Sequence, residues 1–156
     1  MGMPRRVMVQ FGLAFPYGLY AVGPVEPELD FERSSKDRPV QARDKETEQL
    51  VWKVEVMDPD PDTKKNDRTF VVRLLADVQP VLPESLPGLP FTPIHLEGLT
   101  AAPWVDTRSC TGPEDGKGHR CRARQGWSFR ASGVTAPKNM PGSAGQSRSG
   151  SNDKAA

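Results

Sequence analysis

The sequence predicts an all-β protein, a small antiparallel barrel or sandwich for which an OB-like architecture is the first choice. Residues 50–57 and 70–75 carry β-branched and aromatic side chains with a period of two, which is typical of half-buried strands. Proline and glycine supply 16 + 14 = 30 of the 156 residues, and this fraction favours many turns over long helices. Short strands joined by turns of this composition are characteristic of small barrels and sandwiches.

The chain divides into one domain and two tails. We expect a frayed N-terminus at 1–6, a single β domain at 7–136, and a disordered Gly/Ser-rich basic tail at 137–156 that lacks the apolar area to pack. Residues 117–156 hold eight basic groups and one acidic group (8 − 1 = +7), whereas 1–116 hold 13 and 19 (13 − 19 = −6). This asymmetry indicates a basic end that is available to a polyanion or an acidic partner, or else a soluble tail that is basic by chance.

The first half of the chain forms the most regular part of the expected sheet. Strands are expected at 7–15 and 19–25, followed by a polar connection at 26–38. The run at 40–43 is expected to pair back on 50–57 through the turn DKETE.

A long antiparallel hairpin is expected next, between 50–57 and 70–75. Its connection, DPDPDTKKNDR, should be a charged protruding loop, because proline cannot donate to a ladder and Asp and Asn favour turns. Asp58, Asp60 and Asp62 alternate as in calcium loops, but the sixth position is Thr63 rather than glycine. A rigid, solvated turn is therefore the better interpretation.

The second half of the chain is more irregular. Four prolines make 79–90 an extended linker, so the helix often found between the third and fourth strands of an OB-fold has no counterpart here. A short strand at 94–96, a polar loop at 106–120 and a last strand within 121–134 complete the expected elements.

Four aromatic side chains on these strands have two interpretations. Alternation places them with valine and alanine, which favours a buried core made of Trp52, Phe70, Trp127 and Phe129. The alternative is a platform on which bases stack, because the same aromatics lie beside basic residues.

Six basic residues are the candidate nucleic-acid contacts: Lys53, Arg73, Arg120, Arg122, Arg124 and Arg130. Residues two apart in an extended chain point to the same side, so the three arginines at 120–124 should project together. Arg130 continues the same parity unless Gly126 introduces a bulge. Arginine suits phosphate through its bidentate fork, although a solvated face neutralised by acids of 1–116 would have the same pattern.

Cys110, His119 and Cys121 offer three zinc ligands with the spacing C-x8-H-x-C. A structural zinc site normally needs four ligands, and the other histidine, His95, lies in a different segment. The sequence therefore predicts no metal, no cofactor and two free thiols. A disulfide is geometrically feasible but unusual in a cytoplasmic protein.

Catalysis and membrane insertion find no support in the sequence. A Gly-rich phosphate loop, G-x-S-x-G and H-E-x-x-H are all missing, so we expect no enzyme and no catalytic residues. No apolar run approaches the roughly 18–20 residues of a membrane span. The apolar N-terminal stretch is interrupted at 16–18 and lacks a small-residue cleavage site, which predicts a cytoplasmic location.

Five segments together resemble a known family. They are YGLYAVGPVEP, SSKDRPVQARDKET, LVWKVEVMDPDPDTKK, PFTPIHLEGLTAAPWVD and WSFRASGVTAPK. In these segments, across roughly residues 11–138, the chain is similar to the small replication activator proteins of actinomycete integrative conjugative plasmids. The resemblance implies activation of plasmid replication, integration and excision, through expression of the element's replication initiator, excisionase and integrase. It implies no catalytic residue, and the CTGPEDGKGHRC loop is an elaboration outside the family pattern.

The resulting expectation is a regulator of a mobile genetic element that acts by binding DNA or the transcription machinery. A helix-turn-helix, the commonest reader of the major groove, is not expected. One alternative is a sequence-independent single-stranded-DNA-binding protein of OB type. Another is a protein-interaction module that never contacts DNA. The expected partners are therefore DNA, duplex or single-stranded, or a protein of transcription or replication, and the oligomeric state stays open.

Overall fold

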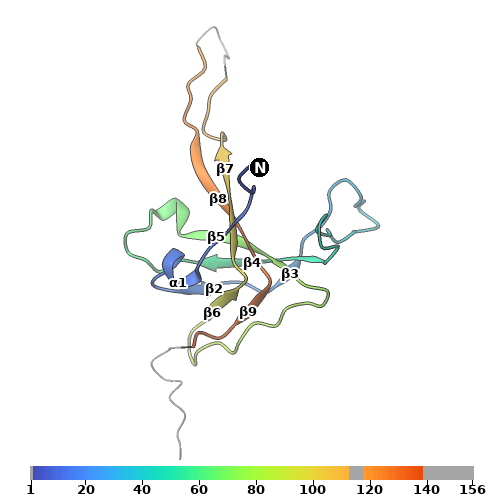
Figure 1. Ribbon diagram of the computed structural model, residues 1–156, viewed down its shortest axis with the longest axis vertical. Coiled ribbons are helices and arrows are strands. Elements are labelled where there is room, and N and C mark those ends of the chain that lie inside the picture. Colours follow the sequence, from blue (N-terminus) through green and yellow to red (C-terminus); the bar gives the residue numbers. More distant parts are fainter. Residues whose placement is uncertain (1, 113–117, 139–156) are drawn as a thin grey trace, which may run out of the picture.

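The computed structural model describes residues 2–112 and 118–138, and within them the chain is almost entirely β (Figure 1). A four-residue helix and a 3-10 turn accompany the strands: α1 (Phe11–Ala14) and η1 (Lys65–Asp67). The strands are β1 (Val7–Met8), β2 (Leu19–Ala21), β3 (Glu26–Pro27), β4 (Val51–Met57), β5 (Thr69–Leu75), β6 (Thr92–Glu97), β7 (Thr100–Asp106), β8 (Arg124–Ala131) and β9 (Gly133–Thr135). No helix in the described ranges is long and apolar enough to cross a membrane.

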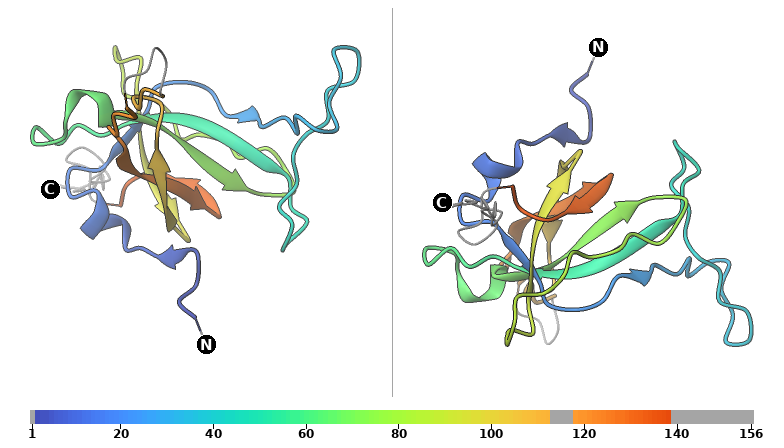
Figure 2. Two further views of the ribbon diagram at one scale, coloured as in Figure 1. Left: turned by 90° about the horizontal axis from the view of Figure 1, so that it is seen from above. Right: turned by 90° about the horizontal axis from the view of Figure 1, so that it is seen from below.

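All the strands belong to one sheet that curls into a half-barrel. Its order is β1-β7-β8-β5-β4-β2-β6-β9, with β3 added beside β4. Neighbouring strands are antiparallel except β5 and β8, which pair in parallel, so the sheet is mixed. The all-β, barrel-like class predicted from the sequence is confirmed. Figure 2 shows that the connection between β3 and β4 extends away from the half-barrel at one end.

A single bent hairpin links the two ends of this sheet. β6 and β7 pair with β9 and β8 in one continuous antiparallel register, from His95↔Thr135 to Asp106↔Arg124. The bend lies between Glu97 and Thr100, where the Ser132 N–H donates to the Glu97 carbonyl at 2.8 Å. The inner half of the hairpin pairs with β2, whereas the outer half rises along the long axis of the molecule (Figure 1).

Gly98 makes this bend, and replacing it is expected to destabilise the fold. Its φ of 60° is a conformation that L side chains rarely adopt, and a Cβ there would meet the Ser132 hydroxyl. We expect Gly98→Ala to lower the free energy of unfolding by about 1–3 kcal/mol. Gly88→Ala is the matched control, because Gly88 has a φ of 75° but open space around it. Equal losses in the two variants, measured by denaturant unfolding, would contradict the clash at the bend.

The core fills the concave side of the half-barrel. Its fully buried side chains come from the four strands β2, β4, β5 and β6: Leu19, Val54, Val56, Val72, Leu74, Ile94 and Leu96. Trp52 belongs to the same cluster with 8% exposure, and its indole N–H donates to the Ala76 carbonyl at 3.0 Å. The partly buried rings of Phe70 and Phe129 pack against the cluster. The expected core role of these three aromatics is confirmed.

Trp127 was expected in the same core, and this prediction is wrong. Its side chain is 49% exposed. Alternation places Trp127 on the same side of β8 as Phe129 and Ala131, but β5 pairs with β8 only from Phe129 to Ala131. Trp127 lies beyond the end of this pairing, so β5 does not cover it.

The N-terminal segment also differs from expectation. A strand over 7–15 is wrong beyond β1, because the chain turns into α1. This turn brings Phe11 and Phe15 onto one side, with ring centroids 5.7 Å apart. Phe15 is buried and stacks on Phe70 at 5.8 Å, so packing of aromatic rings favours the helical turn over an extended chain.

Other expected elements are confirmed. β4 and β5 form the long hairpin in register from Val51↔Leu75 to Met57↔Thr69. The run at 40–43 is only partly as expected, because it forms no strand: Arg43 makes an isolated bridge to Leu50 across the turn DKETE, and Gln41 bridges Leu29. The 79–90 linker contains no helix. The strands β3 and β7 were not anticipated. Most of the expected C-terminal tail, 139–156, lies outside the described residues.

Candidate nucleic-acid interface

Three of the predicted basic residues form a row across the outer face of the sheet. Lys53 on β4 is in register with Arg73 on β5, and Arg73 is in register with Arg130 on β8. Alternation puts this row on the face opposite the buried Trp52 and Val72. The structure therefore brings Lys53, Arg73 and Arg130 together.

Carboxylates neutralise much of this row. The Arg73 guanidinium lies 2.8 Å from a Glu28 carboxylate oxygen, and that of Arg130 lies 2.9 Å from Asp44. Burial alone would raise the pKa of Asp44, but hydrogen bonds from Thr47 and the charge of Arg130 outweigh it, so the pKa is lowered. Polyanion binding to the row would have to displace these acids.

Arg6 extends the row from the segment that was expected to be frayed. Its guanidinium donates to the Ser128 carbonyl at 2.8 Å, which anchors this part of the N-terminus on β8. Burial, followed by repulsion from Arg130 and Arg73, lowers the pKa of Arg6. The face thus holds several guanidinium groups close together, with Glu28 and Asp44 as compensating charges.

The outer half of the bent hairpin, residues 103–127, forms a second surface that we call the arm. β7 and β8 pair here without interruption from Pro103↔Trp127 to Asp106↔Arg124. The Trp104 ring lies over Gly126, 2.6 Å from where a Cβ of that residue would sit. Gly126 therefore provides space for the Trp104 indole and does not introduce a bulge. Because the strand is not interrupted, Arg124 lies on the same side of β8 as Arg130.

The two faces of the arm differ in chemistry. One carries Trp104, with the Arg108 guanidinium 5.9 Å from its ring centroid. Hydrogen bonds from Arg108, which also lies 2.7 Å from Asp106, lower the pKa of that carboxyl to about 2. The other face carries Val105 and Trp127, which are 65% and 49% exposed. These two apolar side chains share one face of the projecting ribbon.

The remaining predicted residues, Arg120, Arg122 and Arg124, lie on the returning strand of the arm and are all exposed. Among the described residues, none of the three is in an ion pair, although Arg124 faces Asp106 in register and helps to lower its pKa. These cations are thus more accessible to a polyanion than those on the sheet.

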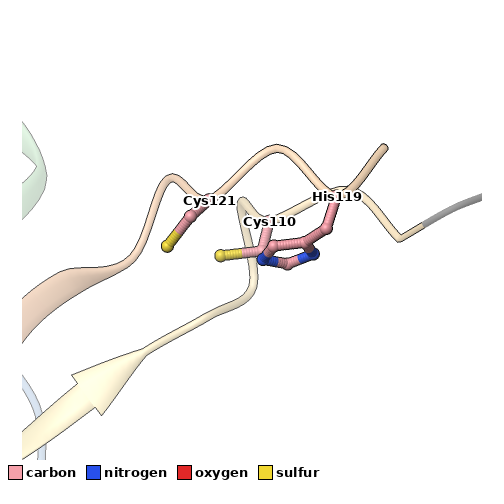
Figure 3. A group of neighbouring side chains, drawn as sticks. All are labelled: Cys110, His119 and Cys121. Carbon is pink, nitrogen blue, oxygen red and sulfur yellow. The ribbon is translucent and has the colours of Figure 1, made fainter. Parts of the chain in front are cut away.

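The exposure of Trp127 was not predicted from the sequence, because alternation on a strand does not show where coverage by a neighbouring strand ends. The relevant sequence feature is the two dipeptides Pro103-Trp104 and Gly126-Trp127. In the register of the hairpin they put the two indoles on opposite faces of the ribbon. The arm also brings together Cys110, His119 and Cys121, whose ligand atoms all lie within 4.8 Å of one another (Figure 3).

Comparison of the chain with protein-family models, with curated proteins and with solved structures gives no match.

Proposed function

We propose that the protein binds DNA through the arm and in this way regulates a mobile genetic element, activating its replication, integration and excision. The observation that carries the DNA contact is Trp127, an exposed indole on a projecting ribbon whose returning strand holds three accessible arginines. The biological role rests on the sequence resemblance to plasmid replication activators.

Charge supports the arm as the primary contact. Over residues 103–127 the sequence holds five basic and three acidic groups, which gives 5 − 3 = +2. Cations that contact phosphates release condensed counterions, and this release drives much of DNA binding. The sheet row would gain less, because Glu28 and Asp44 already pair with two of its three members.

The exposed indole supports contact with unpaired bases. Stacking of a base on an aromatic ring contributes about 1–3 kcal/mol and tolerates any sequence. A two-stranded ribbon can also enter the major groove of duplex DNA. The arm therefore suits DNA that is opened locally or already single-stranded.

Strand order gives a further reason. The strands β2, β4, β5, β6–β7 and β8–β9 follow the order of the five strands of an OB-like barrel. In OB-folds, the face of strands two and three and the loops 1–2 and 4–5 bind oligonucleotides. The arm consists of the outer ends of the fourth and fifth of these strands and the connection between them. Lys53 and Arg73 lie on the second and third strands, and Arg130 lies on the fifth. Fold likeness alone does not prove function, so the site must be tested directly.

This strand order also favours a second candidate, a single-stranded-DNA-binding protein without sequence preference. Three DNAs distinguish the candidates: a single-stranded oligonucleotide, a random duplex and duplex promoter DNA of the element. Binding is measured at several salt concentrations by fluorescence anisotropy. A regulator should prefer promoter DNA, and the second candidate should prefer the single strand. If the protein binds none of the three DNAs at low salt, both candidate functions are overturned and a protein-interaction module is favoured.

The contribution of Trp127 can be measured separately. We expect Trp127→Ala to weaken binding to a single-stranded oligonucleotide roughly tenfold, because one stacked base is lost. Tyr17→Ala is the matched control, since Tyr17 is also an exposed aromatic, at 59%, but follows α1 away from the arm. Parent-like affinity of Trp127→Ala would remove this indole from the interface.

A further inference from the structure

The two cysteines and the arm histidine lie on one face of a short two-stranded ribbon. Beyond β7 and β8 the chain forms an isolated antiparallel bridge between Thr111 and Arg120, whose backbones exchange two hydrogen bonds of 3.2 Å. Extending this register places Cys110 directly opposite Cys121. Side chains two apart on a strand share a face, so His119 lies on the same side as Cys121. Figure 3 shows the three side chains gathered together.

A one-residue change of register produces this alignment. Between the Asp106↔Arg124 pair and the Thr111↔Arg120 bridge, residues 107–110 face the shorter segment 121–123. A turn absorbs the extra residue, with the Cys110 N–H donating to the Thr107 carbonyl at 2.9 Å. This turn sets Cys110 against Cys121.

The three ligand atoms lie close enough to one another to share a transition-metal ion after small rotations. The two sulfurs and a nitrogen of the His119 ring all lie within 4.8 Å of one another. Zinc bonds of about 2.3 Å to sulfur and 2.0–2.1 Å to nitrogen place tetrahedral ligands about 3.5–3.8 Å apart. Small side-chain rotations at an exposed site would close the remaining difference. A site made of cysteine and histidine side chains binds zinc in preference to hard cations such as Mg²⁺ and Ca²⁺, which prefer oxygen ligands.

A hydrogen bond to one sulfur is already in place. The backbone N–H of Arg122 donates to the Cys110 sulfur at 3.3 Å. Hydrogen bonds of this kind orient metal ligands and are part of working metal sites. The Cys110 sulfur is thus directed by the backbone of the opposite strand, next to the other cysteine.

We propose that Cys110, His119 and Cys121 bind one Zn²⁺ ion in the arm. The register places Gly112, which has no side chain, opposite His119, and among the described residues no fourth donor joins the three ligands, which leaves a position for solvent. Three protein ligands with one open position give an accessible zinc site rather than a closed structural one. The ion would join the two strands of the arm beyond β7 and β8. The proposal does not depend on DNA binding.

Cobalt titration of the full-length reduced protein tests the proposal. Co²⁺ reports thiolate ligation by a charge-transfer band in the near ultraviolet and tetrahedral geometry by intense d–d bands in the visible. We expect both signals to saturate at one equivalent of Co²⁺ and to disappear when Zn²⁺ is added. Cys121→Ser should abolish the charge-transfer intensity of one thiolate, and His119→Ala should weaken Co²⁺ binding about tenfold or more. Thr111→Ala, at an exposed residue next to Cys110, should leave the titration unchanged.

Two results would overturn the proposal. One is a reduced protein that shows no charge-transfer band with Co²⁺, which would leave the cysteines as a thiol pair or a disulfide across the ribbon. The other is a titration that stays the same in Cys121→Ser and His119→Ala, because the ion would then be held elsewhere. Circular dichroism of each variant confirms that the β fold is retained.

Discussion

Replacing Arg120, Arg122 and Arg124 together with glutamine is expected to weaken DNA binding strongly while the protein stays folded. Each phosphate contact contributes about −0.9 to the slope of log K against log salt concentration on duplex DNA. Losing up to three contacts should therefore flatten the slope by up to about 2.7. The largest loss of affinity should appear at low salt. The three side chains are exposed, so folding should not depend on them.

The matched control removes cations from another loop. Lys64 and Lys65 are exposed in the connection between β4 and β5, which projects away from the arm (Figure 1). Lys64→Gln combined with Lys65→Gln should keep the parent's salt slope. If the arginine variant and the lysine variant lose the same affinity per removed charge, DNA is attracted by the overall charge of the protein and not by a contact with the arm. If the arginine variant keeps the parent's slope, these arginines are not the contact.

Trp52→Ala is expected to have the largest effect on stability. Truncation of a buried aromatic costs about 3–5 kcal/mol, because burial is lost and a cavity remains. Trp52 is buried in the core cluster, and its indole also satisfies the Ala76 carbonyl. For a chain of this size we expect Tm to fall by roughly 10 °C.

Trp127→Ala gives the corresponding control for an exposed tryptophan. It should change the free energy of unfolding by no more than about 0.5 kcal/mol, as is usual at the surface. Thermal unfolding of the two variants side by side distinguishes the core indole from the arm indole. Equal melting temperatures would contradict the assignment of Trp52 to the core.

Local pattern was sufficient to predict the β4–β5 hairpin. Alternation between Val51 and Met57 and between Thr69 and Leu75 fixes which side chains face the core, and the DPDPDTKKNDR connection contains residues that end strands. The same alternation puts Lys53, Arg73 and Arg130 on the face opposite the core. These properties depend on neighbours in sequence and on strand pairing alone.

Features that depend on distant parts of the chain could not be predicted in this way. Burial of Trp127 depends on where β5 stops pairing with β8, and the strand pattern of β8 contains no information about that point. Neutralisation of Arg73 and Arg130 depends on Glu28 and Asp44, which come from the connection that extends from the half-barrel. α1 depends on the contact of Phe15 with Phe70.

The metal ligands show the same limit. The sequence shows three residues that could bind a metal. Whether their side chains lie close together depends on the turn at Thr107 and on the bridge between Thr111 and Arg120. The requirement for a fourth protein ligand applies to closed structural sites. An open site needs only three, and the geometry at Cys110, His119 and Cys121 is compatible with that class.

Fluorescence of Trp127 itself tests the DNA-binding arm most directly. In a Trp104→Phe variant, emission comes from Trp52, which is buried in the core, and from Trp127, which is exposed. Titration with a single-stranded oligonucleotide at low salt should quench the solvent-exposed component to saturation, because a base stacks on the Trp127 indole, and should leave the buried component unchanged. Binding that is measured independently by anisotropy but leaves the Trp127 emission unaltered would contradict the arm as the DNA contact.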